Sequence, residues 1–471
     1  MFQMRLTGLV QGKRGKYLGL SLVLAWYYCL WFAPKSLQHP FQIDDRTTYG
    51  WLSTLLATVI SILLLAIVLG RTRHLPRQPA LVWTVAGLGV CATIGISTSV
   101  ASAVAFYAFS VLAGVCIGLF WVMWGEWLTS MRAIYSLQHL GPVMGVTGLV
   151  TSLLVCWMPT VLVVVFVALM PLGSGYLMWQ SWRTGSAHGF PPILPSRIAS
   201  QVSARVFAVC AIGFVAAGVC YFVIAITPWD GLPGGPRTSF CIGLGMGAVI
   251  MLVLTLVITR AQHPTPTRPK ISQVMPWLVL SSIGVCLLYL LNCYTGAFLV
   301  ALAAAGTFEV VLVMYMSRLT LSGYVSPATA SANSLVAVRS GICVAVGLAL
   351  LWRHSQALNS DDVTKAMLLA VALLAALLIP LVRQEYAIEE LTRDPQDASE
   401  WETTIAGIAK QFKLSARETE IIDMLGRGYT ATAIAERFVI SPHTVNTHVQ
   451  HIYDKLGIHK RSEMLDYLNK R

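Results

Sequence analysis

The stretch Leu414–Arg461, LSARETEIIDMLGRGYTATAIAERFVISPHTVNTHVQHIYDKLGIHKR, decides how the C-terminal end of the chain folds. Ser415 and Glu418 have the spacing of a capping box, so a helix is expected to begin there. Its apolar residues recur at helical spacing as far as Gly426. The stretch therefore opens with a helix that has one face suited to burial.

Two further helices are predicted in the same stretch. Thr430 can cap a short helix, and Ser441 with Pro442 is a typical start of a longer one that Gly457 can end. The longer helix carries an apolar stripe and a polar stripe, formed respectively by Val445, Val449, Ile452 and Leu456, and by His443, Asn446, Thr447 and Gln450. The last two of these helices are joined by a short turn, and the second of them carries polar groups on its outer face. This pattern predicts a helix-turn-helix whose second helix can enter the major groove of DNA.

This stretch resembles the C-terminal DNA-binding domain of LuxR-type (NarL/FixJ-like) bacterial transcriptional regulators. The positions that match the family pattern in order and spacing are Arg417, Glu418, Glu420, Gly428, Ile434, Ala435, Ser441, Thr444, Val445, His448, Ile452, Lys455, Leu456, Gly457 and Arg461. Two places differ from the pattern: Ala431-Thr432-Ala433 replaces a run that is usually polar, and Asn446 stands where lysine is common. A small helical bundle that binds protein or only packs is the alternative interpretation.

The resemblance also implies roles for individual residues. The side chains expected to meet base edges of double-stranded DNA are Asn446, Thr447 and Gln450. Those better suited to phosphates are Ser441, Thr444, Lys455, Lys460 and Arg461. The last helix resembles the dimerisation helix of the family, and its apolar side consists of Met464, Leu465 and Leu468. A homodimer bound to an inverted-repeat operator is therefore expected.

The rest of the chain is far more hydrophobic. The 471 residues have a mean hydropathy of +0.68, and 56% are hydrophobic against 11% charged. This composition predicts an integral membrane protein with a small soluble part. Residues 1–383 carry 22 Lys and Arg against 7 Asp and Glu, whereas residues 384–471 carry 11 against 14. The basic excess therefore belongs to the membrane part.

Apolar runs long enough to cross a bilayer recur twelve times, six on each side of a proline-containing connector around residues 191–195. They lie near residues 17–33, 49–70, 80–98, 101–125, 139–158, 160–181, 203–226, 239–259, 274–292, 294–317, 328–352 and 365–383. This six-plus-six arrangement resembles the major facilitator superfamily (MFS), whose halves pack around a cavity at mid-membrane depth. The expected fold is all-α, with a transmembrane sensor domain at 1–383, an acidic cytoplasmic linker at 384–403 and a four-helix LuxR-type helix-turn-helix domain at 404–471.

The basic residues of the connections predict the orientation. If the N-terminus is cytoplasmic, fifteen Lys and Arg lie in cytoplasmic segments and five on the opposite side. Cytoplasmic loops carry such an excess. An even number of crossings then returns the C-terminus to the cytoplasm, where the DNA is. The expected location is the inner (cytoplasmic) membrane, with multiple passes through the lipid bilayer and both termini in the cytoplasm.

Few ionisable residues fall inside the predicted spans, and each is costly enough to suggest a role. Glu309 and Arg339 could bind a small-molecule ligand in the central cavity, or form an ion pair between neighbouring helices, which is the favoured interpretation. Trp121 and Trp124, with the nearby Glu126 and Trp127, could line a cavity for an aromatic ligand. An interfacial aromatic belt is the favoured alternative for these tryptophans.

These features together predict a one-component, membrane-embedded transcriptional regulator whose transmembrane domain senses a ligand and controls DNA binding. The loop Gly70–His74 keeps the glycine and arginine of the corresponding facilitator loop but lacks its acid, which favours a sensor over a working carrier. The alternatives are an MFS-type transporter with a gene-regulatory tail and a plain membrane anchor. The sequence contains no recognisable catalytic motif and no metal-ligand pattern. No enzymatic activity, metal site or cofactor is therefore expected.

Overall fold

The computed structural model describes residues 17–32, 45–70, 73–75, 77–99, 102–131, 137–184, 190, 196–227, 235–260, 271–321, 325–355, 360–383, 405–426, 431–438, 440–458, 460 and 463–464. These residues fall into two compact units, a larger one before Arg393 and a smaller one after it. In the described ranges all regular structure is helical and no strand occurs. The expected all-α fold class is confirmed.

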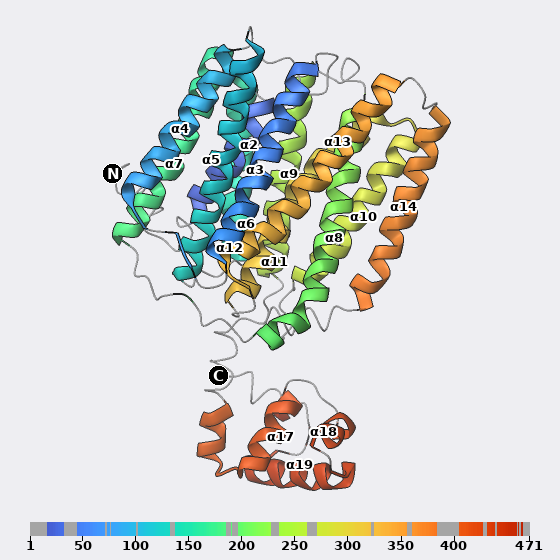
Figure 1. Ribbon diagram of the computed structural model, residues 1–471. Helices are drawn as coiled ribbons and strands as arrows, with labels where there is room; N and C mark the ends of the chain where they lie inside the picture. The colour runs from blue at the N-terminus through green and yellow to red at the C-terminus, as the bar shows by residue number, and fades with distance from the viewer. Residues whose placement is uncertain are drawn as a thin grey trace. The chain divides into compact units, whose positions relative to one another are not determined.

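The larger unit consists of two consecutive sets of helices (Figure 1). The first set is α2 (Leu18–Phe32), α3 (Asp45–Leu69), α4 (Pro79–Thr98), α5 (Ala103–Ser130), α6 (Leu137–Trp157) and α7 (Thr160–Thr184). The second set is α8 (Ser196–Ile226), α9 (Gly235–Arg260), α10 (Ile271–Leu290), α11 (Tyr294–Leu321), α12 (Pro327–Ser331) continuing through the π-helix η3 (Ala332–Val336) into α13 (Ala337–Ser355), and α14 (Ser360–Arg383).

These helices coincide with the predicted apolar runs, since α12, η3 and α13 together form the eleventh. Nine helices within the described residues are long and apolar enough to cross a membrane, and α2 and α10 contain shorter apolar stretches. Large apolar side chains such as Ile67, Val104 and Trp157 are exposed on the outside of the unit. A bilayer would cover this surface, because soluble proteins rarely expose large apolar patches. The number of twelve crossings stays a prediction.

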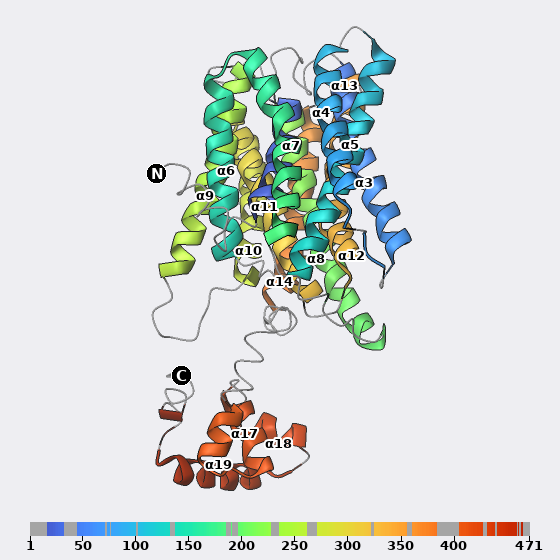
Figure 2. The same ribbon diagram turned by 90° about the vertical axis from the view of Figure 1, so that its left-hand side faces the viewer.

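Each set of helices packs mainly within itself, and a few helices join the two sets. In the first set α4 packs against α5 and α7, and in the second α11 packs against α8, α9 and α10. Contacts between the sets run from α6 to α9, which lie side by side in Figure 2, from α3 to α13 and η3, and from α5 to α12. The centre of the unit is therefore lined by helices of both halves.

Small residues and hydroxyl groups allow the close helix contacts of the first half. A side chain at Gly114 would collide with the backbone carbonyl of Thr54 on α3. The Thr54 hydroxyl donates to the carbonyl of Ser110, 2.9 Å away, and the Thr58 hydroxyl donates to that of Gly114 at 3.1 Å. Such approach of small residues is the usual basis of helix packing in membranes.

The smaller unit has its own core. A helical segment at 405–411 precedes α17 (Ala416–Gly426), α18 (Ala431–Phe438) and α19 (Pro442–Leu456). The inward residues of all four segments form one buried cluster that includes Ile408, Ile421, Ile434, Val445 and Ile452. The predicted acidic linker 384–403 lies outside the described residues, as does the capping residue Thr430.

Candidate functional site

Both ends of α19 have the predicted local structure. The backbone N–H of Thr444 donates to the Ser441 hydroxyl at 3.0 Å, which caps the N-terminus, and Pro442 occupies the first turn. Gly457 ends the helix in the left-handed conformation with φ of 69°. A residue with a β-carbon is disfavoured there, which explains the glycine. The helix is thus held in place by its caps and by the buried Val445 and Ile452.

The opposite face of α19 is exposed and polar. Asn446, Thr447 and Gln450 all lie on it, as predicted from the helical spacing. The Thr447 hydroxyl donates to the carbonyl of His443 at 3.0 Å, and the Gln450 amide donates to Asp454 at 3.3 Å. These are contacts within one helix turn, so the amides of Asn446 and Gln450 are at the surface, where a base edge could meet them.

The predicted phosphate-binding residues differ in exposure and in whether their polar groups already have partners within the domain. Ser441 and Thr444 are exposed, and their hydroxyl oxygens lie 2.8 Å apart at the start of α19. Lys460 is exposed, whereas Arg461 lies outside the described residues. The Lys455 ammonium donates to Glu418 at 2.6 Å and to the carbonyl of Lys413 at 3.3 Å. Lys455 therefore holds the domain together, and any phosphate contact would share its ammonium group.

Glu418 connects two helices of the domain. It forms the predicted capping box, since Ser415 N–H donates to its carboxylate at 2.6 Å and Glu418 N–H donates to the Ser415 hydroxyl at 3.2 Å. Burial alone would raise the pKa of Glu418, but the hydrogen bonds from Lys455 and Ser415 outweigh burial and lower this pKa to about 2. The carboxylate is therefore charged at neutral pH and ties α17 to the end of α19.

The predicted dimerisation residues are only partly described. Met464 is fully buried in the core of the smaller unit, so its side chain does not lie on a free surface. Leu465 and Leu468 lie outside the described residues. A dimerisation proposal therefore depends on these two leucines and not on Met464.

In the membrane unit, Glu309 of α11 and Arg339 of α13 form a buried ion pair. The Arg339 Nη2 atom lies 2.6 Å from Glu309 Oε1, and the two side chains are 1% and 2% exposed, respectively. The hydroxyl of Tyr28 on α2 donates to the other carboxylate oxygen at 3.1 Å, and the guanidinium lies 3.3 Å from the ring centre of Tyr27. The pair thus belongs to the second half of the unit and is covered by α2 of the first half.

The tryptophans of α5 are buried inside the bundle. Trp124 is 1% exposed, and its indole N–H donates to the Ser174 hydroxyl of α7 at 2.9 Å. Trp121 lines a small cleft between the halves, next to Leu20, Val313 and Ser331 and with room for about one water molecule. The interpretation as an interfacial belt is wrong for these residues, because a belt residue faces the lipid headgroups.

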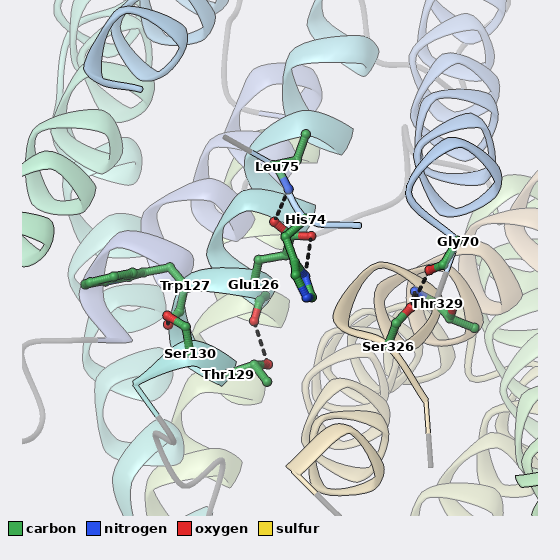
Figure 3. A network of polar contacts seen from close by, with 10 residues as sticks. Gly70, His74, Leu75, Glu126, Trp127, Thr129, Ser130, Ser326 and Thr329 are labelled. Carbon is green, nitrogen blue, oxygen red and sulfur yellow. Dashed lines mark hydrogen bonds and ion pairs between the residues drawn. The ribbon is translucent and has the colours of Figure 1, made fainter. Parts of the chain in front are cut away.

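A polar network that was not predicted surrounds Glu126 near the end of α5 (Figure 3). The backbone N–H of Leu75 donates to one carboxylate oxygen at 2.8 Å, and His74 Nδ1 lies 3.6 Å from the other. The His74 ring stacks on Phe190 with 3.4 Å between centroids. Burial and, second, the charge of Arg77 lower the pKa of His74 below its ordinary 6.5. The imidazole is therefore neutral at pH 7.

The loop after α3 contacts both halves of the membrane unit. On one side, Glu126 of α5 accepts a hydrogen bond from the backbone N–H of Leu75, and this single carboxylate in an apolar run was the sequence signal for the contact. On the other side, the hydroxyl of Ser326 donates to the carbonyl of Gly70 at 3.0 Å and accepts from Thr329 N–H at 3.3 Å, which caps α12 (Figure 3). The loop therefore joins α5 to α12.

Comparison with known proteins identifies the class of the smaller unit. Residues 413–468 match the family model described as bacterial regulatory proteins, luxR family. The C-terminal part is therefore a LuxR-type helix-turn-helix domain, and the predicted resemblance is confirmed.

Individual relatives match over a short part of the chain. The oxygen regulatory protein NreC of Staphylococcus aureus strain bovine RF122 / ET3-1 is 39% identical over 67 residues, which are 14% of this chain and 31% of that protein. NreC of strain JH9 is 40% identical over the same length and the same shares. The chain thus spans about a third of the length of the curated relatives that it matches.

The membrane unit has the fold of MFS-type transporters. A bacterial homologue of the iron transporter ferroportin, in an outward-facing state, superposes with a TM-score of 0.56 at 12% identity, over 79% of this chain and 99% of that one. The human organic anion transporter MFSD10 (TETRAN) superposes with a TM-score of 0.51 at 12% identity, over 78% and 97%. At this level of identity the likeness concerns the fold.

Proposed function

We propose that this protein is a one-component transcriptional regulator embedded in the inner membrane. One observation carries the proposal: a LuxR-type DNA-binding domain is joined in a single chain to a unit with a transporter fold. In this scheme a small molecule binds the membrane unit, favours one arrangement of its halves, and changes how a pair of C-terminal domains is presented to DNA.

A complete switch requires a ligand with a large difference in affinity for the two arrangements. A complete change from 1:99 to 99:1 needs a ligand that binds one arrangement about 5.5 kcal/mol more tightly than the other. One hydrogen bond joins the two halves at the centre of the unit, because the donor Tyr28 and the acceptor Glu309 come from different halves. Rocking the halves apart would break this hydrogen bond, and a ligand that replaces it would bias the equilibrium.

Within the smaller unit, we assign base contacts to Asn446, Thr447 and Gln450 and phosphate contacts mainly to Ser441, Thr444 and Lys460. All six are exposed: Asn446, Thr447, Gln450 and Thr444 on α19, Ser441 as its capping residue and Lys460 beyond its end, which supports this assignment. We further propose that two copies bind an inverted repeat. The exposed face is suited to the major groove of double-stranded DNA.

The test of the proposed function compares the whole chain with a fragment that starts at residue 384. DNA occupancy and target-gene expression are measured in cells for both. A regulator whose membrane unit senses a signal is expected to lose its regulated response in the fragment. If the fragment regulates its target genes as the whole chain does, the membrane unit acts only as an anchor.

A transporter that also regulates genes is the second candidate, and the fold of the membrane unit favours it. The two candidates differ in ligand movement. Reconstituted vesicles with an imposed proton gradient would accumulate the ligand if the unit is a carrier, whereas a sensor binds the ligand without accumulation.

A further inference from the structure

A small cavity in the first half of the membrane unit is lined by aromatic rings and one carboxylate. It lies near the ends of α5 and α7, next to the connection between α3 and α4. Its walls include Leu75, Arg77, Glu126, Trp127, Trp182 and Phe190. With Arg77 in place, the cavity has room for about one water molecule. None of these residues lines the cleft between the halves, so the cavity is a separate site.

Arg77 already places a cation in this cavity. Its guanidinium lies 4.9 Å from the ring centre of Trp127 and 5.9 Å from that of Phe190. The indole of Trp182 packs edge-on against Trp127, with 6.1 Å between the centroids and 72° between the rings. A cation within about 6 Å of an aromatic face is attracted by the ring, most strongly by tryptophan. The cavity is therefore an aromatic cage of a size that holds one guanidinium group.

The carboxylate of the cage has an oxygen to which no described residue donates. Glu126 is 5% exposed, and its Oε2 atom accepts from the N–H of Leu75. Within the described part of the chain its Oε1 atom accepts no hydrogen bond, since His74 Nδ1 at 3.6 Å is too distant. Arg77 directly precedes Gln78, the N-cap residue of α4, so its backbone is held by the start of that helix. A free guanidinium has no such tether and could approach Oε1 while it stacks on the rings.

We propose that the membrane unit binds a small guanidinium compound in this cage, where the ligand replaces the side chain of Arg77 on Trp127 and donates to Glu126. Arg77 is exposed, so its side chain can turn into solvent. Because one guanidinium replaces another, the charge beside Glu126 stays the same. This inference rests on the proposed function, because it names a ligand class for the sensor.

The walls of the cage distinguish this class from related molecules. A quaternary ammonium ion is attracted by aromatic rings but has no N–H to donate to Glu126. An uncharged urea has the plane and the N–H groups of a guanidinium, but without the charge both its attraction to the rings and its hydrogen bond to the carboxylate are weaker. A guanidinium combines charge, planarity and N–H donors. In the predicted orientation the connection between α3 and α4 is cytoplasmic, so the ligand would arrive from the cytoplasm.

The test measures the thermal unfolding midpoint (Tm) of the full-length protein in detergent at constant ionic strength. Methylguanidinium, N-methylurea and tetramethylammonium are titrated separately. The dependence of Tm on concentration gives an apparent affinity, because a ligand of the folded state stabilises it. Methylguanidinium is expected to raise Tm and to bind about tenfold more tightly than tetramethylammonium, which lacks the hydrogen bond to a charged acceptor. N-methylurea is expected to leave Tm unchanged.

Removal of the resident arginine distinguishes a ligand site from a purely structural contact. Arg77→Ala removes a tethered competitor, whose effective concentration is on the order of millimolar, and is expected to raise the affinity for methylguanidinium about tenfold. Arg183→Ala is the matched control, because this arginine lies 4.7 Å from the ring centre of Trp179 but does not line the cavity. The control is expected to bind methylguanidinium as the unmodified chain does.

Two further positions remove the contacts that the ligand would make. Glu126→Gln and Trp127→Leu are each expected to lower the affinity for methylguanidinium about tenfold, through loss of the charged acceptor and of the ring face, respectively. Trp127→Phe keeps a weaker aromatic face and is expected to bind with intermediate affinity. This conservative variant keeps the test decisive if Trp127→Leu does not fold.

The proposal is overturned if N-methylurea or tetramethylammonium acts as strongly as methylguanidinium, if Arg77→Ala binds methylguanidinium no better than Arg183→Ala does, or if Glu126→Gln or Trp127→Phe keeps the full affinity. A response that occurs only in Arg77→Ala also overturns it, because the cage is then closed to ligands by its own arginine.

Selection of duplexes from a randomised DNA library by the same preparations separates this result from the proposed function. DNA selection without a methylguanidinium response removes only the ligand class. A full-length protein that selects no DNA removes the proposed function, whatever methylguanidinium does.

Discussion

Two amides on the exposed face of α19 set the sequence preference that we expect of the DNA-binding domain. Asn and Gln can pair bidentately with adenine, so A·T pairs are expected opposite Asn446 and Gln450. Replacing either residue by Ala is expected to cost about 1 to 3 kcal/mol of binding free energy on the preferred site and to relax its sequence choice. Titrations on matched and scrambled duplexes measure both effects.

Lys460→Ala is the control for these variants, because Lys460 is exposed and we assign it to a phosphate contact. It is expected to weaken binding to all sequences alike and to reduce the slope of log affinity against log salt by about one. Unchanged sequence preference in both Asn446→Ala and Gln450→Ala would show that this face of α19 does not read bases.

Neutralising one member of the Glu309–Arg339 pair leaves the charge of the other without a partner inside the membrane unit. Each single neutralisation is expected to destabilise the protein by about 3 to 5 kcal/mol. Exchanging the two residues, or neutralising both, is expected to restore most of the loss. The unfolding midpoints of the single and double variants in detergent measure this coupling. Single variants as stable as the unmodified chain would mean that water reaches the pair.

At the level of elements, the Glu418–Lys455 contact makes the packing of α17 on α19 sensitive to acid. The pKa of Glu418 is lowered from 4.5 to about 2 in the folded domain. A lowered folded pKa stabilises the fold above the unfolded pKa, and this contribution is lost as pH falls from about 4.5 through 2. Glu418→Gln is expected to cost about 2 kcal/mol at neutral pH and to flatten stability against pH in that window.

Urea unfolding of the residue 404–471 fragment at several pH values measures this effect, because the unit has its own buried core. Glu420→Gln is a matched control, since its ion pair with Arg417 lies on the surface of the same helix. A control that loses the acid sensitivity as Glu418→Gln does would contradict the assignment.

Helices were predictable because their signals are local. Ser415, Ser441 and Gly457 act on neighbouring backbone groups, and long apolar runs have few folded alternatives to a helix in a membrane. Contacts between distant segments were not predictable in the same way. Leu75 and Glu126 are 51 residues apart and Tyr28 and Glu309 are 281 apart, so no spacing rule relates them. The tryptophans of α5 were placed wrongly in a belt because sequence alone does not reveal which helix covers them.

At the level of the whole molecule, the proposed regulator works only if its C-terminal domain lies on the same side of the membrane as DNA. The positive-inside bias of fifteen basic residues against five predicts that side. This prediction assumes twelve crossings. Nine helices in the described residues have the length and composition that a crossing requires. Orientation and crossing number therefore have to be tested together.

Reporter fusions provide that test. A reporter active only outside the cytoplasm is expected to work when fused between Pro34 and Thr48, because this connection follows a first crossing from the cytoplasm, and to be silent after Arg197. A cytoplasmic reporter fused after Arg471 is expected to be active, since an even number of crossings returns the chain to its starting side. The reverse pattern at the first two sites would invert the unit. If the first two fusions give the expected pattern, an inactive cytoplasmic reporter at the C-terminus would mean an odd number of crossings, and the DNA-binding domain could then not reach its target.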